Sequence, residues 1–277
     1  MHSDNGSGET FEAIRHGNGG NLLLLLHAAG SSPRALDRLA RLLAEDVGST
    51  LALSLESKTH PLITGGPVPF APALDVVDSA FRADSGRGHA LLGHSMGGLI
   101  GVLALLQGVT ARAAVFYEPI VLSLLDPGDP TDSRLIAGDQ EEVSALFSHM
   151  ARGETEAGVS RFIEAYGDAP WKDLPAHVRN DLVQRAPQIL ATAHATSGTR
   201  LDVAAVARIE APVLILSGSR SPDIVRRMAD VLGQRLPTAT RAEISGAGHM
   251  GAVTHAAEAH ALVRPFLQRH GMMCSPR

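Results

Sequence analysis

The sequence predicts an α/β fold: a mostly parallel, doubly wound sheet with helices on both faces and an all-helical segment inserted into it. First, short unbroken apolar runs alternate with amphipathic stretches over much of the 277 residues, which is typical of buried parallel strands and their connecting helices. Second, this alternation stops between about residues 121 and 201. Third, residues 93–97 read Gly-His-Ser-Met-Gly between an apolar strand and an apolar helix, a sharp turn that suits the edge of such a sheet.

The first elements follow the order strand, helix, strand. Residues 9–15 alternate weakly between apolar and polar, which predicts an edge strand, and the unbroken leucine run 22–26 predicts a buried parallel strand. Ser32 is expected to cap the next helix, with Pro33 in its first turn. Residues 50–55 are expected to form the next strand. The helix between these strands presents an apolar stripe at helical spacing, made of Leu36, Leu39, Leu42 and Leu43.

The middle of the chain leads into the serine turn. Residues 57–72 are rich in glycine and proline and predict a long loop, a kind of segment that is often functional. A helix over 74–83 follows. The strand expected over 89–92 and the buried helix expected over 97–107 flank the turn, and residues 113–117 read as a further strand.

The second half of the chain begins with helices alone. Helices are expected over residues 139–151, 154–166, 175–185 and 186–196, separated by Gly, Pro and Asp. Alternation then returns, with strands over 211–216 and 240–244 and helices over 223–236 and 253–270. We therefore expect residues 1–119 and 204–277 to form an α/β core. Residues 120–203 are expected to form a helical cap over the carboxyl edge of the sheet, where ligands bind in open α/β folds.

The composition is ordinary for a soluble globular protein. Hydrophobic residues make up 44%, charged residues 19%, and the net charge is −5. No long run of one sign occurs, so neither a nucleic acid nor a membrane surface is an expected partner. The longest apolar run, 22–26, is too short to span a bilayer, and the N-terminal residues lack a signal-peptide pattern. The single cysteine, Cys274, fits a reducing compartment, so the expected location is cytoplasmic; the oligomeric state is left open.

Ser95, in the middle of the turn, is the candidate nucleophile. Flanking glycines let strand and helix approach closely and allow the serine a conformation that is costly for most residues. A serine hydroxyl is a weak nucleophile in water, so it needs a base, a group that orients the base, and N–H groups that bind an oxyanion. The backbone N–H groups of Met96 and of Ala29, in the loop after residues 22–26, are expected to form that oxyanion site.

The base is expected to be one of the 13 histidines, because imidazole titrates near neutral pH. His249 follows the last predicted strand in a glycine-rich loop, which places it over the same sheet edge as Ser95. His94 adjoins Ser95 but is expected to point elsewhere and pack. His27, at the end of another strand, is expected to order the oxyanion loop and to border the substrate pocket.

Over nearly its whole length the chain resembles the α/β-hydrolase fold family. The residues that carry the resemblance are Leu26, His27 and Gly30 together with the runs 93–98, 212–218 and 246–249. The resemblance implies a serine–histidine–acid triad, a helical cap after the sixth strand, and neither cofactor nor metal. Two positions depart from the family pattern: Ala28 stands where many members have glycine, and Ser221 stands where the triad acid usually lies.

Two carboxylates are candidates for the missing acid. Glu118 closes the strand 113–117, and some members of the family have their acid at the end of that strand. Asp223 lies two residues beyond the usual place, but a helix start with Ser221 as cap and Asp223 in the first turn explains it structurally. No such explanation covers a glutamate at the end of a buried strand, because an unpaired buried charge costs several kcal/mol or shifts its pKa. Glu118 is therefore preferred, with Asp223 as the alternative.

These residues predict an enzyme that hydrolyses an ester, lactone or thioester with a small to medium, mostly apolar acyl group through an acyl-enzyme on Ser95. The expected partner is this small-molecule substrate. Two other hypotheses stay open: a cofactor-free lyase or dioxygenase in which the histidine acts purely as a base, and a binding protein without turnover. The candidate pocket residues of the helical segment, whose spacing equally fits core packing, are Phe147, Met150, Phe162, Tyr166 and Trp171.

Overall fold

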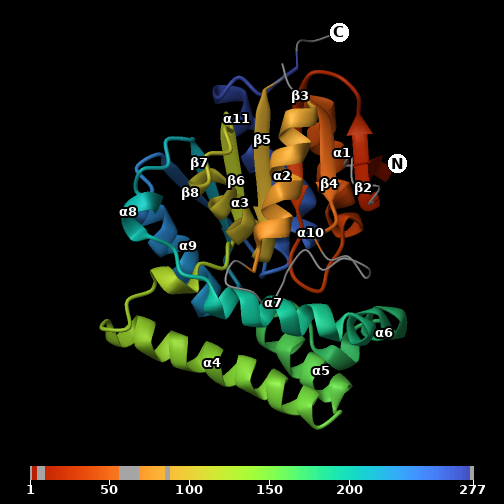
Figure 1. The fold of residues 1–277 in the computed structure, drawn as a ribbon, viewed down its shortest axis with the longest axis vertical. Helices are drawn as coiled ribbons and strands as arrows, with labels where there is room; N and C mark the ends of the chain where they lie inside the picture. Colours follow the sequence, from red (N-terminus) through yellow and green to blue (C-terminus); the bar gives the residue numbers. More distant parts are fainter. Residues whose placement is uncertain (1, 5–9, 56–68, 85–87, 275–277) are drawn as a thin grey trace.

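One mixed sheet runs through the molecule (Figure 1). The computed structural model describes residues 2–4, 10–55, 69–84 and 88–274. Within them the strands form an eight-stranded sheet in the order β1-β2-β4-β3-β5-β6-β7-β8. β1 and β2 pair antiparallel with their neighbours, and all other pairs are parallel. The strands are β1 (His2–Asp4), β2 (Thr10–Gly17), β3 (Asn21–Leu26), β4 (Gly48–Leu53), β5 (His89–His94), β6 (Ala113–Tyr117), β7 (Val213–Gly218) and β8 (Ala239–Ile244).

Alternate side chains of the strands contribute to two separate cores, one on each face of the sheet. In β3, Leu22, Leu24 and Leu26 belong to one core, and Leu23 and Leu25 to the other. The first core also contains side chains of α2 (Ala71–Ala83), α3 (Met96–Leu106) and α9 (Asp223–Arg235). The second contains side chains of α1 (Asp37–Val47) and α11 (Ala256–Arg269). This is the doubly wound arrangement that the sequence predicted, and burial on both faces explains why the strands are apolar without interruption.

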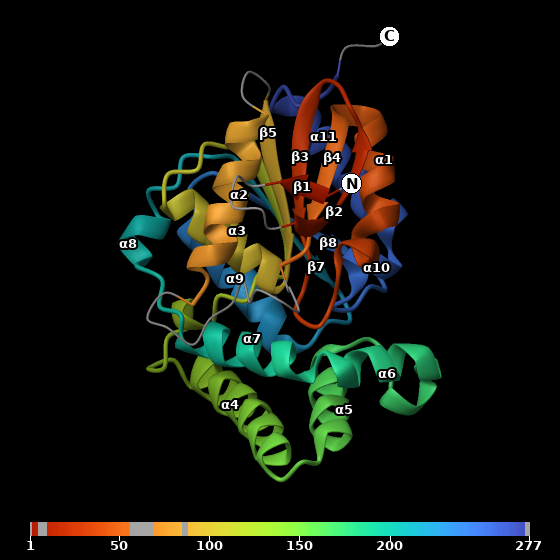
Figure 2. The same cartoon turned by 45° about the vertical axis from the view of Figure 1, so that its right-hand side comes forward.

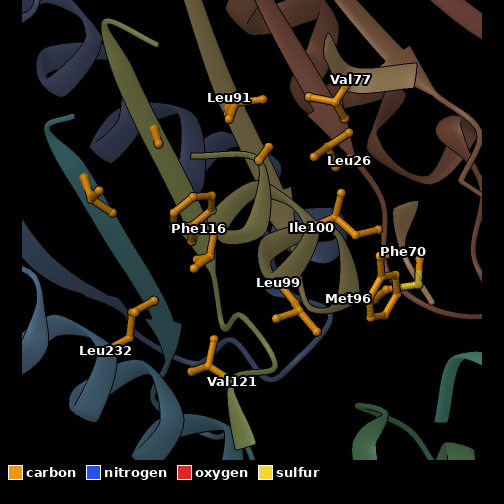
Figure 3. Packing of buried hydrophobic residues seen from close by; sticks show 14 of the residues in the cluster. Leu26, Phe70, Val77, Leu91, Met96, Leu99, Ile100, Phe116, Val121 and Leu232 are labelled. Atoms are coloured by element: carbon orange, nitrogen blue, oxygen red, sulfur yellow. The ribbon is translucent and has the colours of Figure 1, made fainter. Parts of the chain in front are cut away.

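Helix α3, which follows the serine, packs directly onto the strands. Figure 3 shows Leu99 and Ile100 of α3 in the cluster of apolar side chains that also contains Phe116 of β6. Close approach depends on glycine: an added Cβ on Gly97 would lie 2.2 Å from the carbonyl oxygen of Leu26. The start of α3 is therefore fixed against the end of β3, which sets the position of the serine turn.

Between β6 and β7 the described chain forms helices and turns and no strand. In Figures 1 and 2, α4 to α7 lie together at one end of the sheet, apart from the helices that cover its faces. They share a small core of their own, built from Leu146, Val159, Ala186, Ile189 and Ala193. The elements are the 3-10 turns η2 (Leu122–Leu124) and η3 (Trp171–Asp173) and the helices α4 (Pro130–Ala151), α5 (Thr155–Tyr166), α6 (Ala176–Gln184), α7 (Ala186–Gly198) and α8 (Val203–Val206).

The N-terminal part differs from the prediction in detail. β2 contains residues 10–15 of the strand expected at 9–15, but it is not an edge strand, because β1 pairs with its outer side. The helix after β3 starts as a 3-10 turn, η1 (Pro33–Leu36), and Ser32 makes no side-chain capping hydrogen bond. Most of the loop expected at 57–72 lies outside the described residues.

Helix boundaries also differ. α4 begins at Pro130, well before the predicted start at 139, because the Asp129 carboxylate accepts hydrogen bonds from the Thr131 and Asp132 N–H groups. The N-cap of α9 is Pro222, so Ser221 does not cap it. The helix expected at 253–270 is interrupted at His255, which separates α10 (Gly251–Thr254) from α11.

Candidate active site

Ser95 lies between β5 and α3 in a strained backbone conformation, with φ 57° and ψ −117°. Such a conformation costs a non-glycine residue about 1–3 kcal/mol and persists only where the surroundings impose it. Here the Ser95 N–H donates to the Tyr117 carbonyl at 2.9 Å, and the Ser95 carbonyl accepts from the Gly98 N–H at 2.9 Å. An added Cβ on Gly93 would lie 2.4 Å from the Gly97 carbonyl oxygen, so a turn this tight requires glycine at 93.

Glu118 follows the neighbouring strand β6 and is fully buried, with 0% of its surface exposed. Its own φ is 45°, a left-handed conformation that turns the chain away from the sheet. One carboxylate oxygen, Oε1, accepts the Gly218 N–H at 2.7 Å, and the other, Oε2, lies 2.7 Å from Nδ1 of His249. Both oxygens therefore have partners, as a carboxylate without contact to water requires.

His249 joins the carboxylate to the serine. Its Nε2 lies 3.0 Å from the Ser95 Oγ, and both residues are buried, at 5% and 6% exposure. An ionised carboxylate only accepts hydrogen bonds, so Nδ1 carries the imidazole proton and Nε2 faces the hydroxyl as an acceptor. An imidazole in this tautomer can accept a proton from the hydroxyl while the carboxylate of Glu118 stabilises the resulting positive charge.

The loop that carries His249 is held by side chains from three separate elements. The Tyr117 hydroxyl donates to the Gly248 carbonyl at 2.6 Å, and the His94 Nε2 bonds the His249 carbonyl at 2.8 Å. The Met250 N–H donates to the carboxylate of Asp168, at 3.0 and 3.1 Å from its two oxygens. Burial, with a contribution from His249, lowers the pKa of His94 to about 3. His94 is therefore a neutral donor that positions this loop, beyond the packing role that its sequence context indicated.

The loop after β3, which carries the expected oxyanion donor Ala29, is held from two sides. The His27 Nδ1 donates to the Ala28 carbonyl at 2.8 Å, and the Leu55 N–H donates to the His27 Nε2 at 2.9 Å. Burial lowers the pKa of His27 to about 4, so the ring is neutral and its two nitrogens have opposite roles. From the helical segment, the Arg185 guanidinium donates to the Ser31 carbonyl at 3.0 Å.

A cavity of about 810 Å³ lies over Ser95 and His249. Ala29 and Met96, the expected oxyanion donors, also border it. The helical segment supplies much of its wall, and most of that wall is apolar: Val143, Phe162, Ile163, Leu174, Val178, Leu182 and Ala193. The cavity therefore lies between the carboxyl edge of the sheet and α4 to α7, the edge where ligands bind in open α/β folds.

The predicted pocket residues divide into two groups. Phe162 and Tyr166 line the cavity, and His27, Phe147, Met150 and Trp171 do not. His27 lies buried beneath the loop that it orders. Phe147 packs edge-on against His194, and Met150 and Trp171 pack against the small core of the helical segment. Helical spacing does not distinguish a side chain that faces the cavity from one that faces a neighbouring helix, so the sequence could not separate Phe147, Met150 and Trp171 from the residues that line the cavity.

Asp223, the alternative acid, is exposed in the first turn of α9. The Nδ1 of His249 bonds Glu118 instead. No group of three or more His, Cys, Asp or Glu among the described residues is placed to hold a metal ion. No described helix combines the length and hydropathy that a membrane span requires.

Comparison with known proteins fits this geometry. The sequence model of the alpha/beta hydrolase family matches residues 23–263. The chain belongs to the alpha/beta hydrolase family. No curated protein matches the chain. The match to the family model confirms the enzyme class that the sequence predicted, an α/β-hydrolase.

Solved structures with the same fold cover almost the whole of this alpha/beta hydrolase. MenH from S. aureus is 16% identical, with a TM-score of 0.70 over 94% of this chain and 98% of that one. A bromoperoxidase from Bacillus anthracis is 17% identical, with a TM-score of 0.72 over 94% and 95%. A putative lipase from Acinetobacter baumannii is 17% identical, with a TM-score of 0.71 over 94% and 88%. At these identities the likeness extends to the fold alone.

Sequence reasoning missed polar residues of the helical segment that reach this hydrolase's site. Asp168 contacts the histidine loop, Arg185 contacts the loop after β3, and Asp139 lines the cavity, where it accepts a hydrogen bond from the Tyr166 hydroxyl at 2.6 Å. Asp139 had a sequence signal, because a carboxylate stands between the apolar residues Ile136 and Val143 along one helix. Asp168 and Arg185 lie in turns between helices and had none.

Proposed function

We propose that this alpha/beta hydrolase is a serine hydrolase that cleaves a carboxylic ester, lactone or thioester through an acyl-enzyme on Ser95. The observation that carries the proposal is one continuous chain of hydrogen bonds. The Glu118 Oε2 lies 2.7 Å from the His249 Nδ1, and the His249 Nε2 lies 3.0 Å from the Ser95 Oγ. These distances fall within the reach that proton transfer needs in a nucleophile–base–orienter arrangement.

The proposed reaction uses each of these groups in turn. His249 removes the hydroxyl proton as the Ser95 Oγ attacks the carbonyl carbon of the substrate. The N–H groups of Met96 and Ala29 bind the negative oxygen that forms, and the N-terminus of α3 adds a favourable field. His249 then gives its proton to the leaving alcohol or thiol. Water, deprotonated by the same imidazole, attacks the acyl-enzyme and releases the acid.

We further propose that residues 120–203 act as a cap on a core formed by residues 1–119 and 204–277. The helical segment supplies much of the cavity wall, so it would shield the reacting groups from bulk solvent, while still admitting the one water that hydrolysis needs, and would set the shape of the substrate pocket. A mostly apolar wall of this size suits a small to medium acyl group. The lipase name of one structure with this fold is consistent with such a substrate.

The direct test is turnover of a short p-nitrophenyl ester by wild type and by Ser95→Ala. The wild type is expected to show a burst of p-nitrophenol and labelling of Ser95 by a fluorophosphonate. Ser95→Ala is expected to lose activity by a factor on the order of 10⁶, because the nucleophile and its base act as a unit.

Each contrary outcome corresponds to a different function. Retention of the natural activity by Ser95→Ala, with no labelling of the wild type, would point to a lyase or dioxygenase in which His249 acts purely as a base. Absence of turnover in the wild type, for esters, lactones and thioesters alike, would point to a binding protein. Both outcomes contradict the acyl-enzyme mechanism.

A further inference from the structure

The cavity wall contains a half-buried polar pair that the proposed reaction does not use. Asp139 of α4 and Tyr166 of α5 both line the cavity over Ser95 and His249. The Tyr166 hydroxyl donates to the Asp139 Oδ1 at 2.6 Å. Phe162, one turn before Tyr166, packs on its ring at 4.9 Å and also borders the cavity. The pair therefore adjoins an apolar side chain of the wall.

Towards the cavity, the pair presents hydrogen-bond acceptors and no hydrogen-bond donor. The only proton of the Tyr166 hydroxyl is committed to Asp139, which leaves lone pairs on that oxygen. The Asp139 Oδ2 has no hydrogen-bond partner among the described residues, and a carboxylate oxygen can only accept. Burial raises the pKa of the Asp139 carboxyl group, and the hydrogen bond from Tyr166 offsets this only in part. A ligand with a hydrogen-bond donor would supply the missing partner.

We propose that Asp139 and Tyr166 form a substrate subsite for a hydrogen-bond donor, a hydroxyl or a protonated amine, at the end of the substrate remote from the scissile carbonyl. This inference rests on the proposed hydrolysis at Ser95 and names the class of ester that the site takes. The substrate is then an apolar ester that ends in one hydroxyl or ammonium group. A substrate that ends in a carboxylate is disfavoured, because it would bring two negative charges together beside a partly desolvated carboxylate.

The arrangement of charge in the helical segment supports this class. The other acidic residues near Asp139 on α4, Glu141 and Glu142, pair with Arg161 at 3.3 and 2.7 Å. In the described part of the chain Asp139 has no cationic partner, and its carboxylate accepts a hydrogen bond from Tyr166. A protonated amine on the substrate would therefore find an unneutralised carboxylate, and a hydroxyl would find a strong acceptor.

The test is a matched series of esters of equal chain length that end in a methyl, hydroxyl, dimethylammonio or carboxylate group, with the terminal group placed first on the acyl and then on the alcohol side. For each enzyme variant, the readout is the ratio of kcat/KM on a given ester to kcat/KM on the methyl-ended ester. Any loss of folded protein cancels in this ratio. Wild type is expected to prefer the hydroxyl and dimethylammonio esters by about tenfold, as a hydrogen bond to a charged group allows. It is expected to reject the carboxylate ester.

The variants separate the charge from the hydrogen bond. Asp139→Asn is expected to keep part of the hydroxyl preference and lose the dimethylammonio preference, and Asp139→Leu is expected to prefer the methyl ester. Glu141→Gln, which removes an exposed carboxylate of the same helix, should leave every ratio unchanged. Unaltered ratios in Asp139→Leu, or a wild type that prefers the carboxylate ester, would overturn the subsite.

Failure of the subsite and failure of the proposed reaction are distinguishable. Equilibrium binding of the same esters to Ser95→Ala, measured by calorimetry, reports the subsite without turnover. A hydroxyl preference that Asp139→Leu abolishes in this background supports the subsite even if Ser95 proves not to be the nucleophile. Wild-type hydrolysis without any such preference leaves the reaction standing and contradicts the subsite.

Discussion

At the scale of single residues, burial distinguishes the two candidate acids. The sequence favoured Glu118 over Asp223 because a glutamate that closes a buried strand has no structural explanation. In the structure Glu118 is fully buried with both oxygens bonded, to Gly218 and to His249, and Asp223 is exposed. The contact of His249 with Glu118 could be anticipated from the sequence because it follows from the position of each carboxylate along a strand or helix.

Glu118→Gln is expected to lower kcat by roughly 10⁴-fold, the size of the loss when a triad acid becomes an amide. The Gly218 N–H, 2.7 Å from Oε1, would bind the amide oxygen and turn the NH₂ group towards His249. Nδ1 would then lose its proton and Nε2 would carry it, so the imidazole could not accept the proton of Ser95. The measurement is kcat on a p-nitrophenyl ester, with thermal unfolding as a check on folding. Asp223→Asn is the matched control, and a large loss there with near-normal Glu118→Gln would reverse the assignment.

At the scale of elements, the sequence predicted the strands from β2 to β8, but not β1, and missed how the helical segment meets the core. Continuous apolar runs identify strands buried on both faces, and glycine-rich turns locate the loops that follow them. The contact between Asp168 and Met250 joins residues 82 positions apart, and Arg185 reaches Ser31 across 154 positions. Such polar contacts produce no periodic pattern in the sequence, because they depend on how whole helices pack against the core.

The contact between Asp168 and the histidine loop predicts that the helical segment positions His249. Asp168→Ala removes the acceptor of the Met250 N–H, and kcat is expected to fall about tenfold with little change in KM. Asp168→Asn keeps an amide oxygen as acceptor and should restore most of the rate. Asp173→Ala, which removes an exposed carboxylate of η3, is the control. Hydrogen exchange of the Met250 amide should rise in Asp168→Ala alone; unchanged exchange together with an unchanged kcat would refute this role.

At the scale of the whole molecule, two buried, neutral histidines at the sheet edge make the stability of the fold depend on pH. His27 and His94 have pKa values lowered by burial to about 4 and about 3. Each ring holds a loop of the candidate site, through Leu55 and through His249. The sequence placed both residues at strand ends, but their burial and their bonds depend on the assembled sheet and loops, so their titration was not predictable.

These histidines are expected to make the protein less stable in mild acid. Near pH 5 the unfolded chain binds protons on both rings, because its histidines titrate near 6.5, whereas the folded protein does not. The stability that the neutral rings contribute is therefore present at neutral pH and is lost as the pH falls through about 6.5, by about 2 kcal/mol for each ring at pH 5.

Urea unfolding at about pH 7.5 and pH 5 measures this loss of unfolding free energy. His94→Asn, which keeps a donor for the His249 carbonyl but does not titrate, should reduce the difference by about half, and His177→Gln, which alters an exposed ring, should not. A difference that is the same in His94→Asn as in wild type would show that His94 is protonated in the folded protein, or that its ring does not govern the acid response.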